Sequence, residues 1–467
     1  MKVLLLTIDA WRASHASFLP GAERACTPEL ARLAEEGVAF SEAVSHGPAT
    51  PYAFPGIMTS TYPLDHGGYE GISQDRTLVS EALAGDGWRC VGVHSNPWLG
   101  EKYGYDRGYA DYRDVGEFDL PFLEWGRDFL LDNFGLDHPV YRAAQTVYRR
   151  VQKPLRAVGG GTADEVRAAS EALDGAPDGT FVWVHLLAPH APYDPPERHR
   201  IAEGVEDVDG TALTTRAQRA PGDLSPAERE TVQDLYAASV RHADEQAGRI
   251  VSAADEDTLV VVTADHGEAL FEHGTVGHPP RLYDELIHVP LLIRPPSAAG
   301  GRDDSRGAVG DGSRTVDARD GPAVVDAQVQ HADVAPTILD YAGVEVPPSF
   351  RGRSLRPAVE GGDVPSRPVI AEVASTEARP GQLDPEALRI CVRTPGRKVV
   401  LADGAVEGFD LDDDPGERRA VADPEGGKWS RLRRILRDRR DEIAFDTGGV
   451  EFDASTEERL RDLGYLE

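Results

Sequence analysis

Short apolar runs recur along much of the chain, and segments with helical periodicity separate them. The runs occupy residues 3–8, 89–94, 181–187, 258–263 and 289–293. Runs of this length that are apolar throughout are typical of strands buried on both faces of a mostly parallel sheet. The alternation of such strands with helices predicts an α/β layered fold.

Helix start signals lie between and after these runs. Thr27 precedes Pro28, and proline favours the first position of a helix. Three pairs have the spacing of a capping box: Thr162 with Glu165, Ser225 with Glu228, and Ser455 with Glu458. These signals predict where helices begin.

The C-terminal third has a different pattern, which predicts a division of the chain. Residues 298–324 are rich in Gly, Asp, Ser and Arg without periodicity, which indicates an exposed loop. A helix is predicted over 331–343, ending at Gly343, and short strands over 369–373, 390–393 and 398–401. We therefore predict a main α/β domain over 1–345, a smaller α+β subdomain with an antiparallel sheet over 346–426, and a helical tail over 427–467 packed on the body.

The 467 residues carry 80 Asp and Glu against 49 Lys and Arg, a net charge of -31. This charge repels nucleic acid and anionic membranes, so neither is expected as a partner. Only five of the 49 basic residues are lysine. High acid with low lysine predicts a halophilic protein whose carboxylates keep its surface hydrated in concentrated salt, the alternative being an acidic enzyme of ordinary habitat.

The three cysteines, Cys26, Cys90 and Cys391, are scattered without the spacing of a zinc site or a disulfide framework. We expect all three to be small buried side chains. The apolar run at 3–8 is too short for a signal sequence or a transmembrane segment. The expected location is therefore the cytoplasm.

Candidate chemistry lies where the predicted strands end. Asp9 follows the first run, Asp265 and His266 follow the fourth, and His190 follows the third. The carboxyl ends of parallel strands meet at one sheet edge, where open α/β sheets bind their ligands. Carboxylates with imidazoles predict a site for one divalent metal ion, with calcium, magnesium, manganese and zinc all open.

A nucleophile is predicted at Thr50, which precedes Pro51 at the expected start of a helix. A hydroxyl and free backbone amides at a helix N-terminus favour an oxyanion, and a nearby metal can lower the pKa of the hydroxyl. An ordinary N-cap is the alternative for this threonine.

Taken together, the motifs resemble the sulfatase family of the alkaline phosphatase superfamily. They follow one another in the order and spacing of that family, over residues 3–15, a helical segment at 27–44, 45–69, 185–196, 260–296, 333–355, 408–417 and 458–467. The resemblance implies an alkaline phosphatase-like fold, with a mostly parallel sheet flanked by helices and a smaller C-terminal antiparallel sheet.

The resemblance also implies roles for single residues. Asp9, Asp265 and His266 match metal ligands, and Thr50 matches the nucleophile and a fourth ligand. His190 matches a substrate contact or general acid, and His278 falls where family members place a Lys or His near the ester. The implied cofactor is one divalent ion. His185 is expected to be a satisfied core residue, and His273 is a weaker candidate.

Several positions depart from the family pattern. Ile8 stands where many sulfatases have a first Asp ligand, and Thr50, Tyr52 and Phe54 stand at the Cys, Pro and Arg of the C-x-P-x-R motif. Formylglycine is therefore not expected. The segment 91–100 lacks the lysine that grips sulfate in arylsulfatases, and Arg12 is expected to pair with Asp9 or solvent.

The sequence thus predicts a metal-dependent hydrolase or transferase of sulfate or phosphate esters, with Thr50 as nucleophile. Superfamily members with Thr or Ser nucleophiles mostly act on phosphorus esters, which favours phospho-substrates. The expected partner is an anionic small molecule, glycan or lipid head group carrying such an ester. The alternative is a sulfatase-like protein without turnover that binds an anionic sugar or lipid group. Residues 113–160 carry no motif that assigns them a role.

Overall fold

The structure is a computed structural model that describes residues 1–116, 162–297, 322–377, 379 and 381–445. The predicted cap at Ser455, most of the 113–160 segment and most of the 298–324 loop lie outside these residues. Within the described part of the chain, every helix is too short or too polar to span a lipid bilayer.

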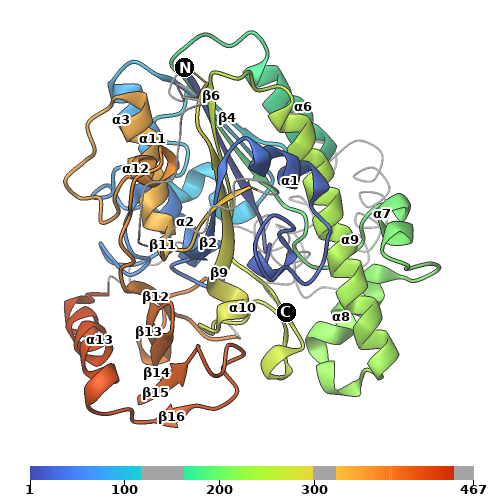
Figure 1. The fold of residues 1–467 in the computed structure, drawn as a ribbon, viewed down its shortest axis with the longest axis vertical. Coiled ribbons are helices and arrows are strands. Elements are labelled where there is room, and N and C mark those ends of the chain that lie inside the picture. The colour runs from blue at the N-terminus through green and yellow to red at the C-terminus, as the bar shows by residue number, and fades with distance from the viewer. Residues whose placement is uncertain (117–161, 298–321, 378, 380, 446–467) are drawn as a thin grey trace, which may run out of the picture.

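A nine-stranded sheet forms the centre of the molecule (Figure 1). Its strands are β1 Lys2–Ile8, β2 Val38–Val44, β3 Arg89–His94, β4 Asp111–Asp114, β5 Thr180–Leu186, β6 Thr258–Ala264, β9 His288–Arg294, β10 Ala323–Val325 and β11 Val329–Gln330. The order is β10-β2-β9-β6-β1-β5-β3-β4, with β11 also paired to β2. All pairs are parallel except those that β9 makes with β2 and β6. The mostly parallel sheet predicted from the apolar runs is confirmed.

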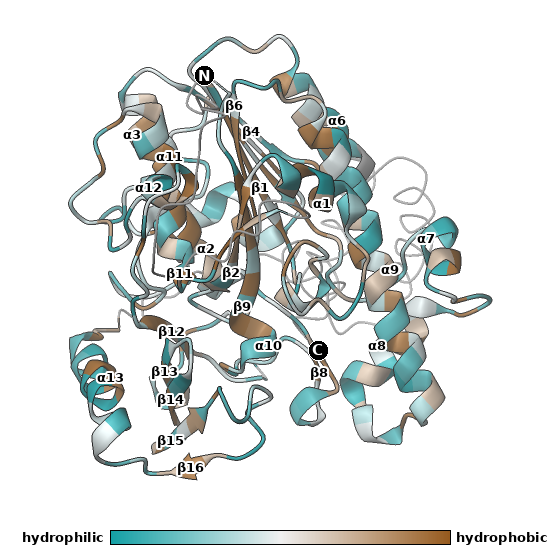
Figure 2. Cartoon of the chain, viewed as in Figure 1, coloured by the Kyte–Doolittle hydropathy of each residue, from teal (hydrophilic) through white to brown (hydrophobic). Residues whose placement is uncertain are grey.

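Helices cover both faces of this sheet, and Figure 1 shows α2, α3, α11 and α12 on one side and α1, α6 and α9 on the other. The helices are α1 Pro28–Glu35, α2 Thr50–Thr59, α3 Val79–Gly85, α6 Thr162–Leu173, α7 Glu197–Ala202, α8 Gly210–Arg219, α9 Pro226–Val251, α10 Asp284–Ile287, α11 Val334–Ala342, α12 Arg356–Val359 and α13 Ser430–Glu442. The central strands are mostly apolar, whereas the helices carry both apolar and polar residues (Figure 2). Apolar side chains are therefore sequestered between the layers.

A second sheet of five antiparallel strands lies at the C-terminal end of the chain. Its strands are β12 Val369–Ala374, β13 Leu388–Thr394, β14 Arg397–Ala402, β15 Ala405–Asp410 and β16 Val421–Ala422. Helix α13 packs on β13 and β14 through Leu432, Leu436 and Trp429. The separate antiparallel sheet is confirmed, while the domain boundary at 345/346 stays a prediction.

Two local predictions were wrong. The segment 27–44 is not one helix, because α1 ends at Glu35 and strand β2 begins at Val38. Gly37 lies between them, and a Cβ atom there would come within 2.7 Å of the Ile293 carbonyl oxygen. The loop predicted over 298–324 also extends too far, since Ala323 and Val324 belong to β10.

The capping signals have mixed outcomes. Ser225 and Glu228 form the predicted capping box at the start of α9. Thr27 precedes α1, but its hydroxyl bonds Ser17 instead of capping the helix. Glu165 lies in α6, yet its carboxylate accepts a hydrogen bond from the Ser95 hydroxyl.

Candidate active site

Two acidic side chains meet at the carboxyl edge of the central sheet. Asp9 follows β1 and Asp265 follows β6, and these two strands are parallel neighbours in register. The backbone amide of Ala10 donates to Asp265 Oδ1 at 3.1 Å. The placement predicted from the strand ends is therefore the one that the fold produces.

His266 completes a buried cage with these two carboxylates. Its Nε2 lies 3.3 Å from Asp9 Oδ1 and 3.6 Å from Asp265 Oδ2, and all three side chains are fully buried. Its Nδ1 is 2.7 Å from the Gly267 carbonyl oxygen, which fixes the ring. Residue 267 must be glycine here, because a Cβ atom would lie 2.1 Å from the Glu285 carbonyl oxygen.

Thr50 lies at the N-terminus of α2, with its hydroxyl against the cage. It donates a hydrogen bond to Asp265 Oδ2 at 2.9 Å and is fully buried. The predicted N-cap position was wrong by one residue, since Ala49 is the cap and Thr50 is the first helical residue. The Thr50 hydroxyl therefore hydrogen-bonds to Asp265 of the cage, and Thr50 is not the N-cap of α2.

Asn96 belongs to the same cluster, and sequence reasoning missed it. Its Nδ2 donates to Asp9 Oδ2 at 2.9 Å and to Thr50 Oγ1 at 3.2 Å. The residue follows β3, whose run of apolar residues ends at His94. The rule that found Asp9 and Asp265, polar residues just beyond a buried strand, would have found Asn96 as well.

His185 is buried as expected, and it also contacts the site. Its Nδ1 lies 3.0 Å from Thr7 Oγ1, and its Nε2 lies 3.3 Å from Asp9 Oδ2. The side chain extends from β5, next to β1 in the sheet. His185 thus supports one oxygen of Asp9 while the other oxygen faces His266.

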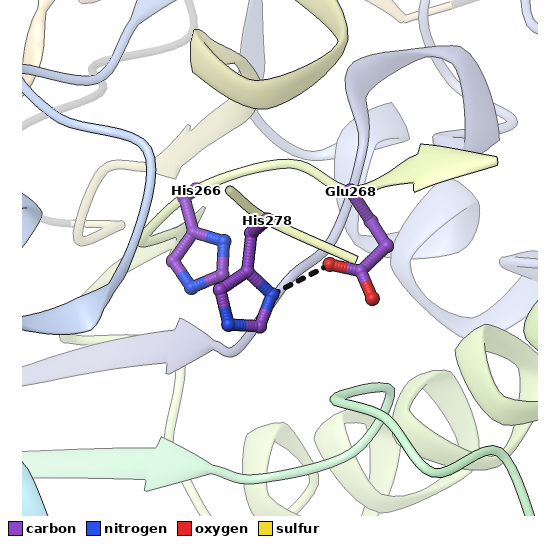
Figure 3. Close-up of side chains that lie close together, drawn as sticks. All are labelled: His266, Glu268 and His278. Atoms are coloured by element: carbon purple, nitrogen blue, oxygen red, sulfur yellow. Dashed lines mark hydrogen bonds and ion pairs between the residues drawn. The ribbon is translucent and has the colours of Figure 1, made fainter. Parts of the chain in front are cut away.

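His190 and His278 form the rim beside the cage. The two ring centroids are 4.8 Å apart, and the His278 ring is 4.6 Å from that of His266. His190 Nδ1 lies 2.6 Å from the Ala191 carbonyl oxygen, so its partner is backbone. His278 Nδ1 lies 2.8 Å from Glu268 Oε2 instead, as Figure 3 shows. The structure thus brings together the six residues of the predicted site: Asp9, Thr50, His190, Asp265, His266 and His278. The weaker candidate His273 pairs with Glu285 instead.

The pKa values of Asp9, Asp265 and His266 are shifted by burial and by the charges of their neighbours. Burial alone would raise the pKa of Asp9, but His190, His185 and His266 lower it well below its usual value. Burial and the Asp9 charge raise the pKa of Asp265. Burial would lower the pKa of His266, yet the two aspartates raise it to about 9. The cage thus favours positive charge at its centre.

The departures from the family motif have visible consequences. Ile8 is buried in the apolar core, and Phe54 packs edge-on against Trp183 and His185 with centroids 5.6 and 5.1 Å apart. The position of the motif arginine is thus apolar. Arg12 pairs with Glu272 at 2.8 Å, so the expected pairing with Asp9 or solvent was wrong.

The residues present fit a divalent cation. Asp9 Oδ1 and His266 Nε2 are buried, face each other and take part in no hydrogen bond. The possible ligand atoms of Asp9, Asp265 and His266 lie within 4.8 Å of one another. Two carboxylates and an imidazole suit a borderline or hard divalent ion.

The chain is similar in sequence and fold to known hydrolases. A model of the sulfatase family matches residues 2–344. An arylsulfatase of Clostridium perfringens is 23% identical over 402 residues, which cover 77% of this chain and 78% of that enzyme. The multifunctional alkaline phosphatase superfamily protein PehA of Trinickia caryophylli is 24% identical over 420 residues, 76% of each chain. The phosphonate monoester hydrolase of Agrobacterium radiobacter shares the fold, with a TM-score of 0.67 at 21% identity over 95% of both chains.

The fold and site thus define a member of the alkaline phosphatase superfamily. Because the family match extends over most of its length, the chain belongs to the sulfatase family. Membership supports an ester hydrolase, as the motifs implied.

Proposed function

We propose that the chain is a hydrolase of sulfate or phosphorus esters in which Thr50 is the nucleophile and a divalent ion is bound by Asp9, Thr50, Asp265 and His266. The observation that carries this proposal is the hydrogen bond from Thr50 to Asp265 Oδ2 inside the buried anionic cage. When bound, a divalent ion would lower the pKa of the Thr50 hydroxyl and stabilise charge on the ester oxygens.

The side chains around the cage have separate roles in the attack on the ester and in the protonation of the leaving group. Asp265 Oδ2 accepts a hydrogen bond from the Thr50 hydroxyl, and Asn96 donates one to the hydroxyl oxygen and so orients it. Thr50 Oγ1 attacks the central phosphorus or sulfur, and the bond to the leaving oxygen breaks. His190 and His278, on the rim, are placed to donate a proton to that oxygen.

We further propose that the reaction is independent of formylglycine. Oxidation of a threonine side chain gives a ketone, whereas oxidation of cysteine or serine gives the aldehyde. All three cysteines are buried, and none belongs to α2. A Thr50 ester must therefore be released by displacement at the central atom, which phosphoryl and phosphonyl centres tolerate better than sulfuryl centres. We expect phosphorus esters to be the better substrates.

The proposal is tested with Thr50→Ala on p-nitrophenyl esters of phosphate, phenylphosphonate and sulfate in the presence of Mn²⁺. The loss of the nucleophile should lower kcat by about 10⁴-fold or more. Thr50→Ser should retain measurable turnover. Thr59→Ala is the matched control, because Thr59 is equally buried at the other end of α2 and its hydroxyl bonds only Pro55 and Thr61.

Unchanged turnover in Thr50→Ala would remove Thr50 as nucleophile. No turnover by the natural sequence on any of these esters, with one equivalent of Mn²⁺ bound, would favour instead a protein that binds an anionic group.

A further inference from the structure

Glu268 and His278 face each other across a short hairpin near the cage. Strands β7 (Ala269–Leu270) and β8 (Val276–Gly277) are antiparallel, with Ala269 opposite Gly277. The next pair outward in this register is Glu268 with His278, and cross-strand neighbours contact each other through their side chains. The 2.8 Å contact between Glu268 Oε2 and His278 Nδ1 thus follows from the strand pairing.

The Glu268 carboxylate is itself held in place. Its second oxygen accepts a hydrogen bond from the Tyr193 hydroxyl at 2.5 Å, and the carboxylate is fully buried. Tyr193 is also fully buried, its backbone amide donates to Thr214 Oγ1, and its ring packs edge-on against Tyr236. Because each oxygen of Glu268 has its own partner, the carboxylate is held in one orientation.

The ligand atoms of His266, Glu268 and His278 lie within 4.8 Å of one another, which raises the question of a second metal ion. His266 offers no nitrogen to such an ion. Its Nδ1 contacts the Gly267 carbonyl oxygen, and its Nε2 faces Asp9 and Asp265. The contacts fit an oriented histidine better than a second metal centre.

We propose that Glu268, braced by Tyr193, is a positioning residue that orients His278 as the proton donor to the leaving group. The Glu268 carboxylate accepts a hydrogen bond from Nδ1–H of His278, so Nε2 lies on the side of the ring away from Glu268 (Figure 3). At His190, Nδ1 contacts the carbonyl oxygen of Ala191. A buried carboxylate bonded to an imidazole fixes the tautomer and the orientation of the ring.

The proton transfers balance over the two half-reactions. As the bond to the leaving oxygen breaks, that oxygen keeps the electron pair and takes the proton from His278 Nε2. In the second half-reaction a water molecule attacks the central atom of the Thr50 ester and gives a proton to His278 Nε2. The bond to Thr50 Oγ1 breaks, and Oγ1 leaves with the electron pair in the deprotonated state in which it attacked. Glu268 keeps its charge throughout and only holds the ring.

This inference rests on the proposed hydrolase, and its test uses two esters of phenylphosphonate with the full chain and Mn²⁺. The methyl ester needs a proton on its leaving oxygen, whereas the p-nitrophenyl ester does not. Glu268→Gln should lower kcat on the methyl ester by about 10- to 100-fold and on the p-nitrophenyl ester by less than about threefold. Tyr193→Phe should show the same preference with a smaller loss, and Glu268→Asp should recover part of the methyl ester activity.

Two controls separate positioning from structure. Glu285→Gln removes the carboxylate of a comparable pair, since Glu285 Oε1 lies 2.8 Å from His273 Nδ1, and should leave the ratio of the two rates unchanged. In a His278→Ala background, Glu268→Gln should have no additional effect on the methyl ester.

Equal losses on both esters, or additive effects of Glu268→Gln and His278→Ala, would overturn the role of Glu268. Failure of the hydrolase itself looks different, because the natural sequence would then turn over neither ester.

Discussion

The negative charge at the centre of the site lies on the carboxylates of Asp9 and Asp265. The two neighbouring histidines, His266 and His190, differ in how their pKa values are shifted. His266 faces both aspartates and its pKa is raised to about 9, whereas burial lowers the pKa of His190 to about 4. His266 therefore carries a proton at neutral pH in the absence of another cation.

Metal binding is accordingly expected to release a proton from His266. Since its pKa is raised to about 9, the affinity for Mn²⁺ should rise by about tenfold per pH unit from pH 7 and level off above about pH 9. Titration calorimetry in buffers of different ionisation enthalpy measures both the affinity and the released proton. His66→Gln, which changes an exposed histidine, should preserve the release. A pH-independent affinity would contradict this assignment.

At the scale of elements, helix α13 takes part in a network of ion pairs between the C-terminal sheet and the main body. Arg439 of α13 donates two hydrogen bonds to Glu372 of β12, at 2.7 and 2.8 Å, and a third to Asp65 at 2.8 Å. Arg351 pairs with the same Asp65 at 2.6 Å. Because the charges of Arg439, Glu372 and Asp65 are buried, each depends on its partners for compensation. The ion-pair network thus couples α13 to the loop after α2.

Arg439→Ala should destabilise the protein by about 3–5 kcal/mol, because it leaves the buried Glu372 without its main partner. Urea unfolding of the full chain gives the free energy. Arg440→Ala is the matched control on the same helix, since the Arg440 side chain is 51% exposed and pairs only with Asp441. Its effect should stay within about 0.5 kcal/mol. Equal effects of the two substitutions would mean that the network contributes little.

For the whole molecule, the net charge of -31 dominates the long-range electrostatics. Repulsion among carboxylates opposes the compact state and is screened by salt, which is the physical basis of the halophilic prediction. The same surface charge repels anionic substrates from afar. The proposed cation and the rim histidines then supply the local attraction that an anionic ester requires.

The unfolding midpoint should therefore rise as KCl increases from about 0.1 M to about 2 M at pH 7.5. Near pH 4 many carboxylates are protonated, so the same salt increase should have a much smaller effect. Thermal unfolding followed by circular dichroism at both pH values measures the difference. A midpoint that is insensitive to salt at pH 7.5 would argue for an acidic protein of ordinary habitat.

The sequence predicted site residues best where a polar residue comes directly after a predicted strand. Asp9, Asp265 and His266 were predicted because apolar runs end just before them, and parallel strands bring such ends to one edge. Strand β2 was missed because VAFSEAV continues the apolar spacing of α1, and only its pairing with β9 makes it a strand. Local periodicity cannot distinguish these cases when tertiary pairing decides.

The sequence by itself determined the strands that end at Asp9 and Asp265 and the residue types that form the cage. Tertiary structure decided which contacts those residues make. It placed Asn96 between Asp9 and Thr50, paired Arg12 with Glu272, and set Glu268 behind His278. The reason is physical: a run of apolar residues encodes a buried strand locally, whereas a hydrogen bond between residues far apart depends on sheet order and register, which no local pattern contains.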